Sequence, residues 1–302
     1  MRSCINVPSL SCLLSSLLIL VTLQSCNSPF HPEQDYKPEL VVYGIAFRGD
    51  STLAIRVDTN SKTQLSDSSS SGEIAGLHGI IVNELNLDTL SLSREYDNGL
   101  NVLVGKIYLA SKTPLFLQVG APGYSTCSAS LTVLDSGLIY PAYFTTDVLR
   151  DPTGPGQPAP QFTIYPSSRT TAIRLTLSLI YQGIGNKGLP VSGEIDLNPS
   201  YQSDTTSYLL LINGATTGVD FNLSDYSYAY SEAVGELNSG TITAVVRLLQ
   251  IDAPLYDFYS ISNGFNDPLT MRTEKPVYTN VTNGLGFFGS AAEDSLAIQV
   301  YP

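Results

Sequence analysis

The sequence predicts an all-β protein of two β-sandwich-like domains, with one short helix near the C-terminus. Two observations predict this fold class. Apolar residues alternate with polar ones in many short segments, and turn-forming residues separate these segments, because the 302 residues include 24 Gly and 18 Pro. A hydrophobic share of 43% is enough for a packed core, so the chain is not wholly disordered.

Strand-like segments follow one another from residue 39 to residue 140. Residues 53–57 and 129–133 alternate apolar side chains with polar or small ones, and residues 40–43 and 115–119 are apolar runs of strand length. About six or seven such strands over roughly 100 residues are typical of an immunoglobulin or transthyretin-like sandwich. We therefore expect an N-terminal β-sandwich over residues 39–140.

A proline-rich stretch separates the two halves of the chain. Four of the ten residues in 151–160 are proline, which excludes a central strand or helix there. We place the domain boundary near residue 140, so residues 141–302 form a second β-rich domain that contains this loop. Its strand-like segments are 172–180, 193–197, 207–212 and 241–248.

One segment of the second half has helical rather than strand character. Asp252 can cap a helix, Pro254 suits a first turn, and Leu255, Phe258 and Tyr259 recur at helical spacing. This pattern predicts the one helix of the fold.

The N-terminus has the features of a secretory signal. Arg2 precedes an apolar run over residues 10–23, which is too short to cross about 30 Å of hydrocarbon comfortably. The run ends in Leu23-Gln-Ser-Cys26, which resembles the lipobox of bacterial lipoproteins, although glutamine is bulkier than the usual residue before the small one. We therefore expect a lipoprotein signal peptide over residues 1–25.

The lipobox resemblance implies acylation of Cys26 and attachment to a lipid bilayer through it. Residues 26–38 contain three prolines and no apolar period, which is typical of a tether. Cleavage would remove Cys4 and Cys12 and leave Cys127 as the only unmodified cysteine, so no disulfide is expected. Cys127 alternates with small and polar residues and is expected to be a buried apolar residue rather than a nucleophile.

The composition argues against several function classes. The chain has 15 Lys and Arg against 27 Asp and Glu, a net charge of −12, whereas nucleic-acid binding needs a cationic surplus. Only His31, in the tether, and His78 could serve as catalytic bases, and no nucleophile elbow is present. Metal-ligand spacings are also missing. We therefore expect no enzyme, no catalytic residue, no metal site and no cofactor.

Two further patterns allow more than one interpretation. Residues 284–289 match the glycine spacing of a dinucleotide-binding loop, but too few residues follow for the rest of that unit, so turn and close-packing roles are favoured. A carboxylate pair for glycoside hydrolysis stays open, although no pair is singled out. The acidic residues weighed for it are Glu84, Glu95, Glu194, Glu232 and Glu236.

Three tyrosines alternate along one segment of the second half. If Tyr226, Tyr228 and Tyr230 lay on a strand, all three would share one face. That face could stack against a ligand such as a sugar or a peptide, or form a half-buried aromatic ladder, which is favoured. The absence of Trp argues against a dedicated carbohydrate surface.

The C-terminal part resembles a known family. Residues 274–289 read EKPVYTNVTNGLGFFG, and with the preceding Tyr-rich helix they are similar to the end of a Bacteroidota outer-membrane lipoprotein family of unknown function. Thr279 stands for the usual Ser and Val281 for the usual Ile. Members of that family are often encoded beside TonB-dependent receptors, so the resemblance implies a receptor as a partner. It implies no catalytic residues.

These patterns together predict a lipid-anchored, non-catalytic protein of the outer membrane, facing the periplasm or the cell surface. The expected role is that of an accessory binding partner of a TonB-dependent transporter. A fimbrial or adhesin-like subunit is the structural alternative. A surface glycosidase or peptidase is the enzymatic one.

Overall fold

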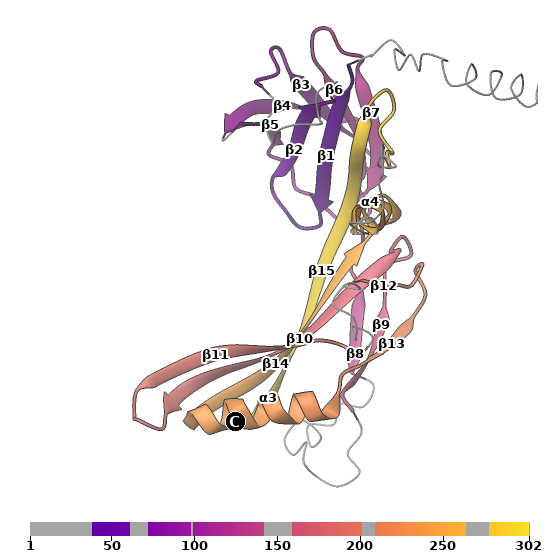
Figure 1. The fold of residues 1–302 in the computed structure, drawn as a ribbon. Coiled ribbons are helices and arrows are strands. Elements are labelled where there is room, and N and C mark those ends of the chain that lie inside the picture. The colour runs from indigo at the N-terminus through magenta and orange to yellow at the C-terminus, as the bar shows by residue number, and fades with distance from the viewer. Residues whose placement is uncertain are drawn as a thin grey trace, which may run out of the picture. The chain divides into compact units, whose positions relative to one another are not determined.

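The computed structural model describes residues 38–60, 72–97, 99–141, 159–200, 209–263 and 278–301. Within these ranges a twelve-stranded sheet, a three-stranded sheet and two helices are present, which confirms the all-β prediction (Figure 1). The predicted signal peptide, Cys26, His31 and the tether up to residue 37 lie outside the described residues, and so does most of the proline-rich loop.

The first region is a sheet that folds over itself. Its neighbouring strands are antiparallel in the order β1-β2-β5-β4-β3-β6-β7. They are β1 (Leu40–Phe47), β2 (Leu53–Thr59), β3 (His78–Asn83), β4 (Asp88–Asp97), β5 (Leu100–Gly105), β6 (Pro114–Gly120) and β7 (Cys127–Thr132). The first half of β4 pairs with β3 and its second half with β5, so β4 passes from one layer of the sandwich to the other.

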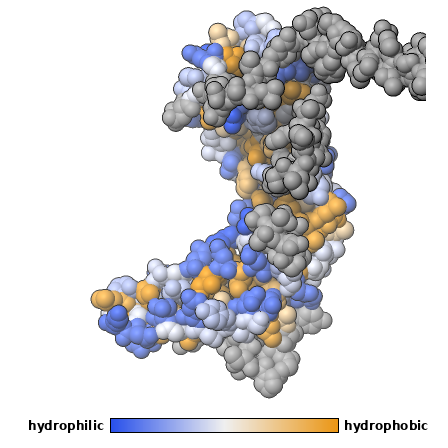
Figure 2. Space-filling view, viewed as in Figure 1, coloured by the Kyte–Doolittle hydropathy of each residue, from blue (hydrophilic) through white to orange (hydrophobic). Residues whose placement is uncertain are grey.

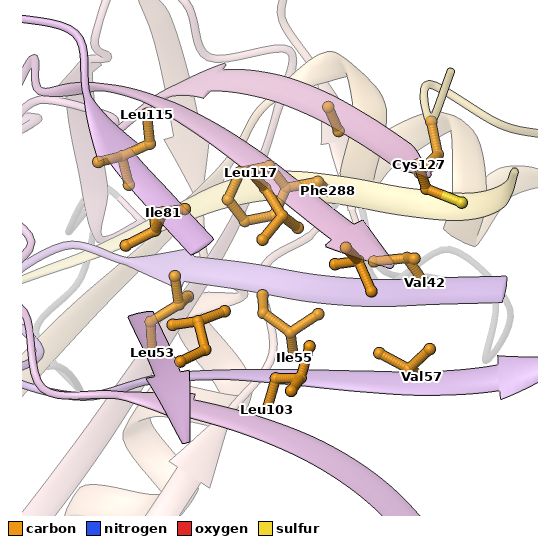
Figure 3. Close-up of a cluster of buried hydrophobic side chains, with 14 of the residues drawn as sticks. Val42, Leu53, Ile55, Val57, Ile81, Leu103, Leu115, Leu117, Cys127 and Phe288 are labelled. Carbon is orange, nitrogen blue, oxygen red and sulfur yellow. The ribbon is translucent and has the colours of Figure 1, made fainter. Parts of the chain in front are cut away.

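Alternate side chains of these strands enclose one core. The most deeply buried members are aliphatic, as the period-two pattern predicts. Figure 3 shows side chains from both layers converging, with Cys127 at one end of the cluster. Its labelled members are Val42, Leu53, Ile55, Val57, Ile81, Leu103, Leu115, Leu117, Cys127 and Phe288. Cys127 is buried, as expected.

The C-terminal strand β15 (Leu285–Tyr301) completes this core. It runs parallel to β1, from Val41 opposite Leu285 to Phe47 opposite Ala291. An isolated bridge joins Ser128 of β7 to Thr282, just before β15. Residues 285–291, which the sequence placed in the second domain, thus belong to the sheet of the first region, and residues 38–302 form one compact unit.

The second region is built on the remaining length of β15. Strands β10, β14 and β15 are antiparallel neighbours, with β11 at one edge and the short β12 beside β10. A three-stranded antiparallel sheet has the order β13-β9-β8. The bounds are β8 (Leu138–Pro141), β9 (Gln161–Tyr165), β10 (Ala172–Gly185), β11 (Pro190–Leu197), β12 (Leu210–Leu211), β13 (Thr217–Asp220) and β14 (Leu237–Ile251).

A second core lies between these two sheets and the helix α3 (Leu223–Glu236). Asn222 caps α3, because its side-chain oxygen accepts a hydrogen bond from the Ser224 N–H at 2.9 Å. Tyr226, Ala229 and Ala233 follow at helical spacing and are buried. The sequence prediction of a strand here was therefore wrong. Tyr226, Ala229, Tyr230 and Ala233 follow a period of 3.6 residues, whereas Tyr228 lies off their face.

The second helix, α4 (Ala253–Asn263), lies on the outer face of β15. It was predicted from its sequence, and Asp252 caps it as expected, since Oδ1 accepts a hydrogen bond from the Leu255 N–H at 3.1 Å. Phe258 packs against Tyr43 and Phe287 in edge-on or tilted contacts. The sequence predicted one helix, whereas the described residues contain two, and the one that it missed is α3.

Candidate binding surface

The three predicted tyrosines do not form one surface. Tyr226 is fully buried in the second core, and its ring stacks on Tyr230 one turn later, with centroids 6.4 Å apart. Burial raises the pKa of Tyr226, and the neighbouring Tyr230 adds to this effect. Tyr228, between them in sequence, is 73% exposed on the opposite side of α3. The helix therefore separates residues that a strand would have kept together.

The candidate carboxylates are also spread over the fold. Glu84 and Glu95 lie in the first region, at the β3–β4 turn and in β4. Glu194, in β11, forms an ion pair with Arg247 at 2.8 Å. No cluster of three or more His, Cys, Asp or Glu side chains that could hold a metal ion occurs among the residues described.

The residues of the glycine-rich C-terminal signature make close backbone contacts inside the fold. A Cβ atom at Gly286, whose φ is +98°, would lie 2.0 Å from the carbonyl oxygen of Val42, and one at Gly284 would lie 2.5 Å from the Cys127 sulfur. The Asn280 amide binds the backbone of Phe288 twice, accepting from its N–H at 2.9 Å and donating to its C=O at 2.8 Å. These contacts bring β15 close to β1 and β7, which agrees with the predicted close-packing role.

Asp252 is the carboxyl group with the most strongly shifted pKa among the described acids. Burial raises its pKa from 3.8 to about 6, while hydrogen bonds from backbone N–H groups oppose the shift. One of these donors is the Ser290 N–H, at 2.7 Å from Oδ2. The Ser290 hydroxyl in turn donates to the Ala46 carbonyl and accepts from the Leu134 N–H. Asp252 therefore joins α4 to β15 inside the protein.

A polar network connects the two regions where β15 leaves β1. Arg48, just after β1, forms an ion pair with Asp294 of β15. The other oxygen of Asp294 accepts hydrogen bonds from the Gly137 N–H at 2.8 Å and from the Gln250 side chain at 3.1 Å. Gln250 also accepts from the Ser167 N–H at 2.9 Å. These bonds satisfy the fully buried Gln250 side chain at the junction.

Two exposed tyrosines and an exposed leucine lie together on the outer side of the three-stranded sheet. Leu138 of β8 pairs with Tyr165 of β9, and Tyr140 pairs with Thr163. Leu138, Tyr140 and Tyr165 are 67%, 62% and 47% exposed. Directly opposite residues on one face have Cβ atoms about 5 Å apart, so these three large side chains form a continuous patch. We call this patch the aromatic face.

Polar groups border the aromatic face on the same side of the sheet. Gln161 pairs with Asp220, and Thr163 pairs with Gly218. Gly218 has no side chain, and the Gln161 amide nitrogen lies 3.8 Å from where its Cβ would be. Hydrogen-bonding groups and ring faces are therefore available side by side, a combination found in small-molecule and peptide sites.

The sheet beneath this patch is firmly packed. Phe162 and Ile164 point from β9 into the second core and are fully buried, and Phe162 meets Phe221 edge-on with centroids 5.9 Å apart. Figure 2 shows hydrophilic and hydrophobic residues intermixed over the part of the second region that is visible there. Sequence analysis did not single out the aromatic face, because residues 138–141 are all apolar and no local pattern marks their exposed side.

Two other hollows on the surface have fewer polar groups available for binding a ligand. One is lined by the ends of β10, β11 and β14, where Gly183 and Gly240 face each other, and no titratable side chain lines it. Another lies beside Glu73 and Tyr124 in the first region. Glu73 is already engaged by Arg94 at 2.6 Å.

Among the described residues, no helix has the length and apolar character needed to cross a bilayer. The resemblance of residues 274–289 to a lipoprotein family thus stays a prediction. No known protein-family model and no curated protein matches the chain.

Proposed function

We propose that the protein is a lipid-anchored, non-catalytic binding protein of the outer membrane, an accessory partner of a TonB-dependent transporter. In this proposal the aromatic face contacts the ligand. The lipobox ending at Cys26 and the signature over residues 274–289 support the anchor and the partner. The exposed side chains of the aromatic face support ligand binding rather than catalysis.

The observation that carries the proposal is the aromatic face itself. Two tyrosines and a leucine stand exposed on a sheet whose other side is a packed core. Exposed apolar patches of this kind mark binding surfaces, because leaving them in water is unfavourable. A sheet surface with an amide and a carboxylate beside the rings suits a sugar ring or an extended peptide.

The shifted titratable groups support a non-catalytic role, since their atoms are already engaged inside the fold. The Asp252 carboxylate accepts from two backbone N–H groups. Burial raises the pKa of the Cys127 thiol, which keeps it protonated and unreactive, and the thiol donates to the Asn283 carbonyl at 3.2 Å.

Co-purification tests the partner. Wild-type protein extracted gently from membranes should bring an outer-membrane β-barrel with it, and the intact mass of the chain should show acyl groups on Cys26. A Cys26→Ser variant should appear in the soluble fraction without the barrel. Recovery of no β-barrel in several mild detergents would contradict the proposed function.

Binding assays test the aromatic face. The wild type is first tested for retardation in native gels that contain soluble polysaccharides and for binding to an immobilised peptide library. A Tyr140→Ala/Tyr165→Ala variant should lose the binding that the wild type shows in either assay. Tyr228→Ala, which removes a still more exposed tyrosine from α3, is the control and should bind as the wild type does.

A further inference from the structure

Strand β11 lies at one end of the large sheet and has a neighbouring strand on one side only (Figure 1). The strand at the other end, β7, is partly paired on its outer side, since Ser128 and Thr282 exchange two backbone hydrogen bonds of 2.8 and 3.1 Å. No backbone of the described ranges pairs in this way with the outer edge of residues 190–197. Such an edge exposes backbone groups that another extended chain can bind.

The β10–β11 hairpin determines which backbone groups of β11 face outward. The Gly185 N–H donates to the Leu189 carbonyl at 2.8 Å, so these two residues form a hydrogen-bonded pair. Hydrogen-bonded and non-hydrogen-bonded pairs alternate along an antiparallel ladder. The odd-numbered residues of β11 therefore bond to β10, and the even-numbered residues turn their backbone groups outward. The outward-facing residues are Pro190, Ser192, Glu194 and Asp196.

The acidic side chains of β11 do not screen this edge. Glu194 forms an ion pair at 2.8 Å with Arg247 of β14, so its carboxylate reaches across β10. Asp196 accepts a hydrogen bond from the Ser178 hydroxyl of β10. Both carboxylates are thus engaged within the sheet, whereas a free charge on an edge strand hinders the addition of another strand.

A second copy of β11 complements this edge in one antiparallel register. When Gly193 of one copy lies opposite Gly193 of the other, Ser192 lies opposite Glu194. Pro190 then lies opposite Asp196, so every outward N–H has a carbonyl partner, and Pro190 has no N–H to satisfy. A shift of two residues one way would place Glu194 opposite itself, an unfavourable pair of like charges. A shift the other way would leave the Asp196 N–H beyond the paired strands.

The same register brings apolar side chains together on the face of the second core. Val191 lies opposite Ile195 of the second copy, a β-branched pair of the kind that stabilises sheets. Leu189, which is 66% exposed, lies opposite Leu197 of the second copy. The hydrogen bonds, the charges and the apolar side chains of β11 thus favour one and the same register.

We propose that β11 pairs with β11 of a second copy of this chain about a two-fold axis at Gly193. The sheet of the second region then continues from one copy into the other, and each copy contributes the same surface, as in most homodimers. This pairing depends on neither the lipid anchor nor the transporter.

Sedimentation of the purified full chain carrying Cys26→Ser tests the proposal, because removal of the predicted acylation site keeps micelles from bringing copies together. This chain should dimerise as its concentration rises. Adding Ser192→Pro should raise the dimer dissociation constant by about tenfold or more, because an outward N–H is lost in each copy. The melting temperature at a concentration where both chains are monomers should stay unchanged, since that N–H makes no bond to β10.

Two charged substitutions at the same position separate the register from the fold. Ser192→Glu places a second carboxylate opposite Glu194 and should raise the dissociation constant by at least about fivefold, whereas Ser192→Lys should lower it. Both side chains would be exposed in the monomer, so neither variant should unfold.

Disulfide formation tests which residues lie opposite each other. A mixture of Ser192→Cys and Glu194→Cys chains should form a mixed disulfide under mild oxidation, because directly opposite residues of a hydrogen-bonded pair lie about 5.5 Å apart. Each variant alone should form little, since its two cysteines would lie diagonally, at about 7–8 Å.

Three results would overturn the proposal. One is a chain that stays monomeric up to the highest concentration at which it is soluble, as expected if another part of the chain or a different protein covers β11. Another is a dimer that neither Ser192→Pro nor Ser192→Glu weakens. The third is a mixture of the two cysteine variants that forms no mixed disulfide.

Discussion

The C-terminal signature and the aromatic face differ in both sequence and burial. The signature is distinctive in sequence, yet Gly286, Phe288 and Gly289 are buried, and its glycines and Asn280 bring backbone segments together. The aromatic face is undistinctive in sequence, yet Tyr140 and Tyr165 are exposed. In this protein the recognisable motif holds the fold together, and the surface suited to binding lies elsewhere.

The largest expected effect is at Gly286. An alanine there would place a Cβ atom on the Val42 carbonyl in a left-handed backbone conformation, so Gly286→Ala should cost about 4 kcal/mol or more of unfolding free energy, or prevent folding. Urea unfolding measures it. Gly235→Ala is the control, since nothing lies within 4 Å of its Cβ position in α3, and it should stabilise by about 0.5–1 kcal/mol. Equal unfolding free energies for the two variants would contradict a structural role of the signature.

The tyrosines of α3 provide the next contrast. Tyr226→Ala should cost about 3–5 kcal/mol, because it leaves a cavity in the second core. Tyr228→Ala should change the unfolding free energy by no more than about 0.5 kcal/mol, since that ring is in water. Comparable losses at the two positions would favour the strand that the sequence predicted over the helix.

A pH dependence is expected from Asp252. Its folded-state pKa, about 6, lies above its ordinary value of 3.8, so the native state binds this proton more tightly than the unfolded state does. The contribution of Asp252 to stability is therefore largest below pH 4 and declines as the pH rises through about 6. The shift corresponds to at most about 3 kcal/mol, at about 1.4 kcal/mol per pKa unit.

Comparison with Asp252→Asn isolates this term from other carboxyl groups. Asp135 acts in the opposite direction, because hydrogen bonding to Lys112 lowers its pKa. The difference in unfolding free energy between wild type and Asp252→Asn should fall as the pH is raised from 4 to 7. A difference that does not vary with pH would show that the carboxyl is not buried as described.

The smallest effect on stability is expected at the aromatic face. Tyr140→Ala/Tyr165→Ala should leave the unfolding free energy within about 1 kcal/mol of the wild type, because Tyr140 is 62% and Tyr165 47% exposed. Thermal unfolding checks this, with Phe162→Ala as the contrast on the buried side of β9. A large loss of stability in the double variant would make the aromatic face part of the core.

The sequence predicted the strands and α4 well, because period-two alternation and a capping Asp252 are local signals. It could not predict that residues 285–291 pair with β1, since a parallel pairing across most of the chain leaves no local mark. It also missed α3, because three alternating tyrosines indicate a strand period, whereas on the helix only Tyr226 and Tyr230 share a face. The aromatic face could not be predicted, because it forms only when Leu138 and Tyr140 of β8 lie beside Tyr165 of β9, and the sequence does not show that pairing.

The central claim is that the protein works as a binding protein through its aromatic face. Residue-resolved nitration of exposed tyrosines tests it most directly, with growing cells compared against the purified chain. Tyr228 should react equally in both samples, whereas Tyr140 and Tyr165 should react in the purified chain and be protected in cells. Equal reactivity of all three tyrosines in cells, or protection of Tyr228 alone, would contradict the claim.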